Sequence, residues 1–103
     1  MEKQKVSKEL YKLTIRLRIS RDILYNKTKE FFEERRYRVE KERFPTLMLL
    51  KGEEGIWEVH FRKEREETRI ELSFKPQVPR LRKKQQEKIR GELVGYIAYI
   101  ESL

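Results

Sequence analysis

The stretch WEVHFRKEREETRIELSF, residues 57–74, decides what kind of fold this chain forms. Large apolar residues occupy alternate positions in both of its halves: Trp57, Val59, Phe61, Ile70, Leu72 and Phe74. Charged or polar residues stand between them. Strict alternation is typical of a strand with one buried and one wet face. The two halves, joined by a charged turn near residues 64–67, are therefore predicted to form an antiparallel hairpin.

A second alternating run predicts another half-buried strand near the start of the chain. Its apolar positions are Tyr11, Leu13, Ile15, Leu17 and Ile19. Ser20 then stands where a helix N-cap is expected, and Asp22 complements the helix dipole in the first turn. Apolar residues follow at helical spacing, so a helix is predicted to end near Arg35.

Two further strands are predicted before the hairpin. Tyr37 and Val39 alternate with charged residues, which favours a short strand that ends near Pro45. LMLLK, residues 47–51, predicts a buried strand. GEEG, residues 52–55, predicts a turn in which glycine can adopt a positive φ.

The last element is a long helix, predicted to begin near residues 79–80 after the chain breaks at Pro76 and Pro79. The predicted order is β-α-β-β-β-β-α in one α+β domain over residues 1–103, with the polar residues 1–9 loosely held. The simplest two-layer arrangement is an antiparallel sheet with both helices on one face. This topology is similar to the helix-grip arrangement of START-like proteins, a resemblance that implies a ligand site under the last helix.

Composition excludes several classes of protein. The chain has 103 residues, of which 43% are charged, and a net charge of +8. No apolar run is long enough for a membrane span, and MEKQKVSKEL lacks the apolar core of a signal peptide, so a cytoplasmic location and no membrane partner are predicted. Without cysteine there are no disulfides or cysteine-based zinc sites. Abundant Lys, Arg and Glu are typical of thermophile proteins.

Catalysis has little chemistry to draw on. His60 is the single histidine, on the wet face of the hairpin, and the expected register places Glu71 opposite it. The pair is either a catalytic dyad or a cross-strand surface pair, and the second interpretation is favoured. No phosphate-binding loop, nucleophile elbow or metal-binding motif occurs. The chain is predicted to be no enzyme and to need no cofactor or metal.

Basic residues suggest a nucleic-acid surface. Residues 80–90 hold six basic residues and one acidic residue, and others alternate along the wet strand faces. The candidate residues are Lys12, Arg16, Arg18, Arg62, Arg69, Arg80, Arg82, Lys83, Lys84, Lys88 and Arg90. No aromatic residue is expected on the wet face, so binding would use the phosphate backbone and not base stacking. The alternative is that these charges only keep the protein soluble.

The last helix has an unusual second face. Ile89, Leu93, Tyr96, Ile97, Ile100 and Leu103 form the stripe that should meet the sheet. The other face is small or apolar: Gly91, Val94, Gly95, Ala98, Tyr99 and Ser102. A glycine inside a helix costs about 1 kcal/mol relative to alanine. This face is predicted to pack closely against a second copy, a partner protein, or the N-terminal segment through Val6 and Leu10. The alternative is that nothing packs there, and that the helix tolerates the two glycines because its large apolar face holds it in place.

Three functions remain open from the sequence. The leading one is a non-catalytic binding or assembly protein that self-associates through the last helix and contacts nucleic acid through its basic surface. The third is a protein that binds the nucleic-acid backbone as a monomer, and the second is a START-like domain that binds a small apolar ligand. The residues that could line such a pocket are Phe31, Phe32, Trp57, Phe61, Phe74 and Tyr96. Core packing is the alternative role for them, and it is favoured in a chain of this size.

Overall fold

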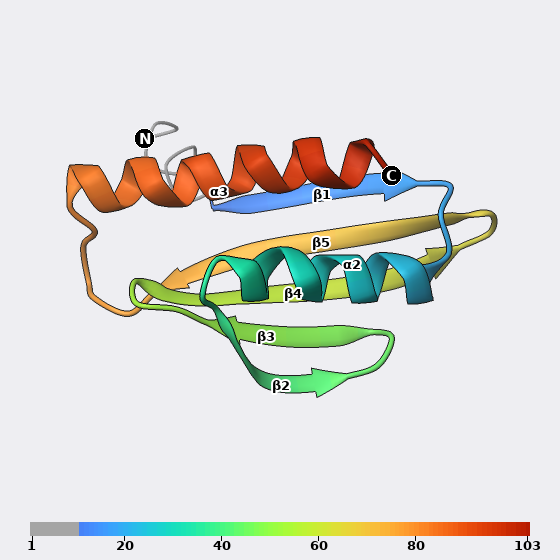
Figure 1. Cartoon of the computed structure of the whole chain (residues 1–103), viewed down its shortest axis with the longest axis horizontal. Helices are drawn as coiled ribbons and strands as arrows, with labels where there is room; N and C mark the ends of the chain where they lie inside the picture. Colours follow the sequence, from blue (N-terminus) through green and yellow to red (C-terminus); the bar gives the residue numbers. More distant parts are fainter. Residues whose placement is uncertain (1–10) are drawn as a thin grey trace.

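Five strands form one antiparallel sheet in the computed structural model, which describes residues 11–103 (Figure 1). They are β1 (Lys12–Leu17), β2 (Arg38–Arg43), β3 (Leu47–Lys51), β4 (Gly55–Glu64) and β5 (Glu67–Pro76). Their order across the sheet is β1-β5-β4-β3-β2. Helix α2 (Arg21–Glu34) follows β1, and helix α3 (Lys83–Glu101) follows β5. The predicted element order and α+β fold class are confirmed.

The predicted hairpin forms the centre of the sheet. In its register Trp57 lies opposite Phe74, and His60 lies opposite Glu71. Strand β1 pairs with the outer side of β5, with Leu13 opposite Leu72. The apolar residues of β1 stay partly exposed, whereas Trp57 is fully buried, because β1 is an edge strand.

Both helices cover the same face of the sheet, as expected. The Ser20 hydroxyl accepts a hydrogen bond from the Ile23 amide at 3.3 Å and so begins α2 at the predicted cap. Helix α3 packs through Ile89, Tyr96 and Ile100, which are fully buried. The hydroxyls of Thr28 and Tyr96 make a buried hydrogen bond of 2.7 Å that joins the two helices. Neither α2 nor α3 lies over the opposite face of the sheet (Figure 1).

The predicted strand β3 forms, and the helices cover only one of its faces. Met48 and Leu50 are fully buried, but Leu47 and Leu49 are only half-buried. The latter pair points to the face that neither helix covers. A short run of consecutive apolar residues does not by itself reveal whether a second layer covers the strand.

Two details at the ends of elements also differ from expectation. No glycine in the described chain has a positive φ. Gly52 is needed because a side chain there would collide with the ring of Tyr37, and Gly55 because one would collide with the Lys75 carbonyl. Helix α3 begins at Lys83, later than predicted, after Leu81 has already entered the core at 5% exposure.

Candidate nucleic-acid interface

The face of the sheet opposite the helices, called the open face below, is predominantly basic. Strand register places its side chains in rows that cross several strands. Its basic residues are Lys12, Arg16, Arg38, Lys41, Arg43, Lys51, Arg62, Arg69 and Lys75, and its acidic residues are Glu58, Glu64, Glu67 and Glu71. No aromatic residue belongs to this face among the described strands, as expected from the alternation.

Three arginines from neighbouring strands lie side by side on the open face, and we call them the arginine row. Arg16 on β1 is opposite Arg69 on β5, and Arg69 is opposite Arg62 on β4. Like charges directly opposite each other destabilise a sheet. The row must therefore be balanced by neighbouring carboxylates.

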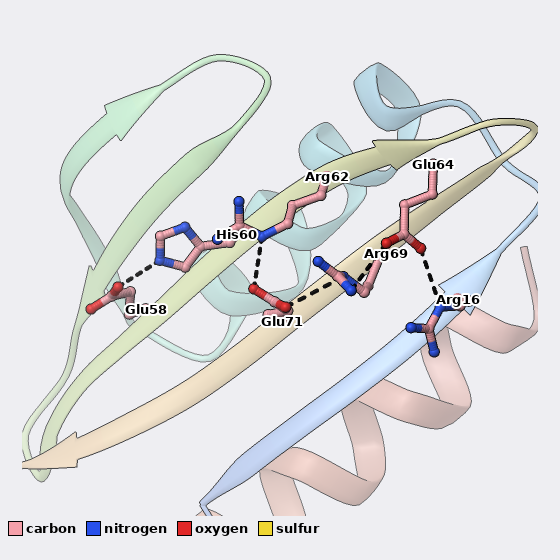
Figure 2. A network of polar contacts seen from close by, with 7 residues as sticks. All are labelled: Arg16, Glu58, His60, Arg62, Glu64, Arg69 and Glu71. Carbon is pink, nitrogen blue, oxygen red and sulfur yellow. Dashed lines mark hydrogen bonds and ion pairs between the residues drawn. The ribbon is translucent and has the colours of Figure 1, made fainter.

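Glu64 and Glu71 supply that balance (Figure 2). Arg62 Nε donates to Glu71 Oε1 at 2.9 Å, and Arg16 Nε donates to Glu64 Oε1 at 3.2 Å. Arg69 Nη1 lies 3.0 Å from Glu64 Oε2. Arg69 Nε lies 3.3 Å from Glu71 Oε2, an ion pair whose angle does not make a hydrogen bond. Two carboxylates thus hold three guanidinium groups in place.

The row keeps hydrogen-bond donors free for a ligand. Arg16 and Arg62 engage their carboxylates through Nε, which leaves their terminal nitrogens available among the described residues. Both side chains are about half exposed, at 53% and 52%. Hydrogen bonding from Arg62, reinforced by the charges of Arg62 and Arg69, lowers the pKa of Glu71, which therefore stays ionised. The guanidiniums are consequently oriented and still accessible.

The side chain of His60 contacts a different carboxylate from that of Glu71, the residue predicted to lie opposite it. Its Nε2 lies 2.6 Å from Glu58 Oε2 on the same strand, while Glu71 is engaged by the arginines. The predicted register is confirmed, but the side chains of His60 and Glu71 are not hydrogen-bonded to each other. A hollow of about 630 Å³ beside the start of β3 includes His60, Arg62 and Arg69 in its wall.

The structure separates the predicted basic residues into two regions. The arginine row lies on the open face toward the β4–β5 turn. The second group, called the helix foot below, belongs to the other layer, where α3 begins near the end of β5 (Figure 1). The helix foot comprises Arg80, Arg82, Lys83, Lys84, Lys88 and Arg90, all exposed. Lys88 is ion-paired with Glu54 at 3.0 Å, which raises the pKa of Lys88.

Two predicted basic residues, Lys12 and Arg18, belong to neither the arginine row nor the helix foot. They lie near the two ends of β1. Lys12 is the first residue of this strand, and Arg18 follows its last residue. Both are exposed. Arg18 borders a separate hollow of about 500 Å³ at the start of α2, together with Arg21, Lys63 and Arg65.

The small face of α3 has two different surroundings. A Cβ on Gly95 would lie 3.7 Å from Phe31 Cζ of α2, and the ring of Tyr99 lies 5.3 Å from the ring of Phe31. The close layer expected beside Gly95 is therefore α2. Within residues 11–103, no atom would approach a Cβ on Gly91 within 4 Å. The exposed residues on this face are Gly91, Val94, Ala98 and Ser102. Val6 and Leu10, through which the N-terminal segment was predicted to cover this face, lie outside the described residues.

The aromatic residues proposed as a pocket lining pack on one another. All six are buried, with exposures of 5% or less: Phe31, Phe32, Trp57, Phe61, Phe74 and Tyr96. The rings of Trp57 and Phe74 are 4.9 Å apart, and that of Phe32 is 5.6 Å from both Trp57 and Tyr96. A ligand in this layer would have to displace these rings.

A polar cluster between α3 and the sheet was not predicted from the sequence. The Tyr37 hydroxyl donates a short hydrogen bond to Glu92, and burial raises the pKa of Glu92. The indole nitrogen of Trp57 lies close to this pair but makes no hydrogen bond of ordinary geometry in the described chain. The sequence does contain an indication of this cluster: the helical spacing of Glu92 from Ile89 and Tyr96 places it on the buried side of α3.

Comparison of the sequence with protein-family models and with curated proteins finds no match. In the described residues, no three or more His, Asp or Glu side chains gather as metal ligands would. Neither α2 nor α3 has the length and apolarity to cross a membrane.

Proposed function

We propose that this protein binds the phosphate backbone of nucleic acid on its open face, without catalysing a reaction. One observation carries the proposal: three arginines lie opposite one another across three strands, oriented by two carboxylates. A sheet that needed only a soluble face would not align like charges, because that arrangement is destabilising. The alignment is useful when a polyanion completes the balance.

Arginine suits this role better than a simple positive charge does. Its planar guanidinium presents several donors in a fork that matches phosphate oxygens. Neighbouring strands are about 4.8 Å apart, so the arginine row extends about 10 Å across the sheet. Because Glu64 and Glu71 hold the side chains, less conformational freedom is lost when phosphate binds.

The open face favours recognition of backbone over sequence. Proteins that read single strands on a sheet stack bases on exposed aromatic rings. The aromatic residues of the described strands, such as Trp57 and Phe74, are buried on the other face. Binding would then depend on phosphate contacts and on release of counterions, which makes it sensitive to salt.

Titration of the full-length protein with several unrelated oligonucleotides, single-stranded and duplex, tests this function. Dissociation constants measured by fluorescence anisotropy should differ little between sequences and should rise steeply with salt concentration. Absence of binding at low salt, or strong preference for one sequence with little salt dependence, would contradict the proposal.

A second candidate function is self-association through α3. It rests on Val94, whose side chain is 59% exposed beside Gly91 and Ala98 on a helix otherwise rich in charged residues. A second copy could cover this face and approach closely because the flanking residues are small. The mass in solution should then correspond to a dimer, and Val94→Lys should give a monomer. A monomeric wild-type protein would remove this candidate and leave nucleic-acid binding unaffected.

A further inference from the structure

Strand β1 ends the sheet with backbone groups that face outward. Phe74 donates a backbone hydrogen bond to the Tyr11 carbonyl at 2.8 Å. In an antiparallel pair, alternate residues direct their backbone groups to the neighbouring strand. Leu13, like Tyr11, therefore turns its backbone groups toward β5, and Lys12, Thr14 and Arg16 turn theirs away from the sheet. These outward groups have no strand partner among the described residues.

The apolar side chains of β1 are also incompletely covered. Leu13 and Ile15 are half-buried, although the residues opposite them on β5, Leu72 and Ile70, are 2% and 1% exposed. This pattern is expected of a strand whose apolar side chains become fully buried only when another strand pairs with it. The edge thus offers both backbone groups and apolar contact.

Helix α3 extends this apolar surface beyond the edge. It runs beside β1 and past its free side in both views (Figures 1 and 2). Gly95 faces α2. In a helix, a residue two positions away lies about 200° around the axis. Leu93 and Ile97 are therefore on the side of α3 that faces away from α2. Both are only partly buried. A strand added beside β1 would have its inner side chains against this part of α3.

The opposite edge of the sheet is protected in a way that β1 is not. The register between β2 and β3 shifts between Val39 and Lys41, and a bulge of this kind hinders pairing with another strand. Strand β2 also carries charges of both signs, including Glu40 and Glu42. The ladder of β1 with β5 has no such shift.

We propose that β1 accepts an extended segment of a partner protein as an additional strand, with acidic residues on one face and apolar residues on the other. Main-chain hydrogen bonds to a sheet edge are a known mode of peptide binding. The charged residues that flank this edge on the open side are all basic: Lys12, Arg16 and Arg18. Opposite charges on paired strands stabilise and like charges destabilise, so this edge selects acidic partners.

A second copy of the same strand fits poorly. Two β1 strands could pair antiparallel about a two-fold axis. If their apolar side chains are to lie on the same face, this axis must pass through a residue and not between two residues. A register centred on Thr14 places Lys12 opposite Arg16, and one centred on Ile15 places Lys12 opposite Arg18. Both registers bring like charges together. Charge complementarity therefore favours a different, acidic chain.

Short synthetic peptides provide the test: one alternates Glu with Val, its counterpart alternates Lys with Val, and a third contains the Glu and Val residues in scrambled order. The alternating acidic peptide should bind at least about tenfold more tightly than either of the others. On binding, the amides of Lys12, Thr14 and Arg16 should gain protection from hydrogen exchange, and that of Leu13 should not change. Equal binding of the peptides, or protection elsewhere, would overturn the proposal.

Thr14→Pro removes one outward donor without touching the ladder to β5, and Thr14→Val is the matched control that retains it. The proline variant should lose most of the peptide affinity while its melting temperature stays near that of the valine variant. Lys12→Glu should shift preference toward the basic peptide. Nucleic-acid binding should be the same in both Thr14 variants, which separates this proposal from the proposed function. Full peptide affinity in Thr14→Pro would contradict edge pairing.

Discussion

The arginine row and the helix foot are equally basic in the sequence, but the fold gives them different physical properties. In the row, Glu64 and Glu71 orient the guanidiniums of Arg16, Arg62 and Arg69. In the helix foot, no ion pair within residues 11–103 involves Arg80, Arg82, Lys83 or Lys84, and these side chains are exposed. The difference teaches that equal positive charge in the sequence can become either an ordered array of paired side chains or a group of exposed side chains held by no carboxylate of the described chain.

The two regions should therefore contribute differently to the binding of a polyanion. Exposed charges act mainly through the long-range field, which steers association and is screened within about 10 Å at 0.1 M salt. Oriented guanidiniums make short-range contacts that hold the complex together. The helix foot would assist encounter, and the arginine row would determine how long the ligand stays.

The largest expected effect concerns the helix that carries the foot. Gly95→Leu should destabilise the protein by about 1–3 kcal/mol, because the larger side chain must fit against Phe31 of α2 and Arg35, the residue that caps this helix. Gly91→Leu, at an open position, should be neutral or slightly stabilising. Thermal melts of both variants decide this, and equal stability would mean that α2 does not restrict α3.

Removing the carboxylate that joins the row should have a smaller effect. Glu71→Ala leaves Arg62 opposite Arg69 without its own ion pair, while Arg69 keeps only Glu64, and the change should cost about 1 kcal/mol of unfolding free energy. Because the pKa of Glu71 is lowered in the fold, its contribution is present at neutral pH and is lost as the pH falls below its ordinary value.

Glu87→Ala in the helix foot is the matched control, since Glu87 is exposed. It should change the stability by less than about 0.5 kcal/mol. The same pair of variants should differ in oligonucleotide affinity. Both variants lose one negative charge, but only Glu71→Ala releases Arg62 and Arg69 from a carboxylate that orients them, so Glu71→Ala should bind more weakly than Glu87→Ala. If denaturant titrations found equal stability for both variants, the carboxylates would not organise the row.

The smallest expected effect involves Glu92, one turn after Lys88 of the helix foot. Burial raises the pKa of Glu92, so the stability associated with its proton is present below its ordinary pKa and is lost as the pH rises through the folded value. Glu92→Gln can still accept from Tyr37 and should raise the melting temperature by a few degrees at neutral pH. At acidic pH the variant and the wild type should melt alike. A lower melting temperature at neutral pH would contradict this assignment.

Much of the fold could be predicted from local patterns, because alternation in residues 57–74 and the cap at Ser20 are properties of neighbouring residues. Alternation also predicted Arg16, Arg62 and Arg69 on the wet faces of their strands. The position of Arg16 directly beside Arg69 could not be predicted, since it depends on β1 pairing with β5, a contact between segments far apart in the chain. Burial of Glu92 depends likewise on where α3 crosses the sheet, which no periodicity encodes.

The central claim is that the arginine row, and not the helix foot, holds the nucleic-acid backbone. Arg62→Gln/Arg69→Gln and Lys83→Gln/Lys84→Gln remove the same charge, and their oligonucleotide affinities can be compared over a range of salt concentrations. The row variant should bind at least about tenfold more weakly, and its log–log salt slope should be smaller by about 1.4–1.8, the value for two lost phosphate contacts. The foot variant should keep nearly the wild-type slope. Equal losses in the two variants, or a larger loss in the foot variant, would contradict the claim.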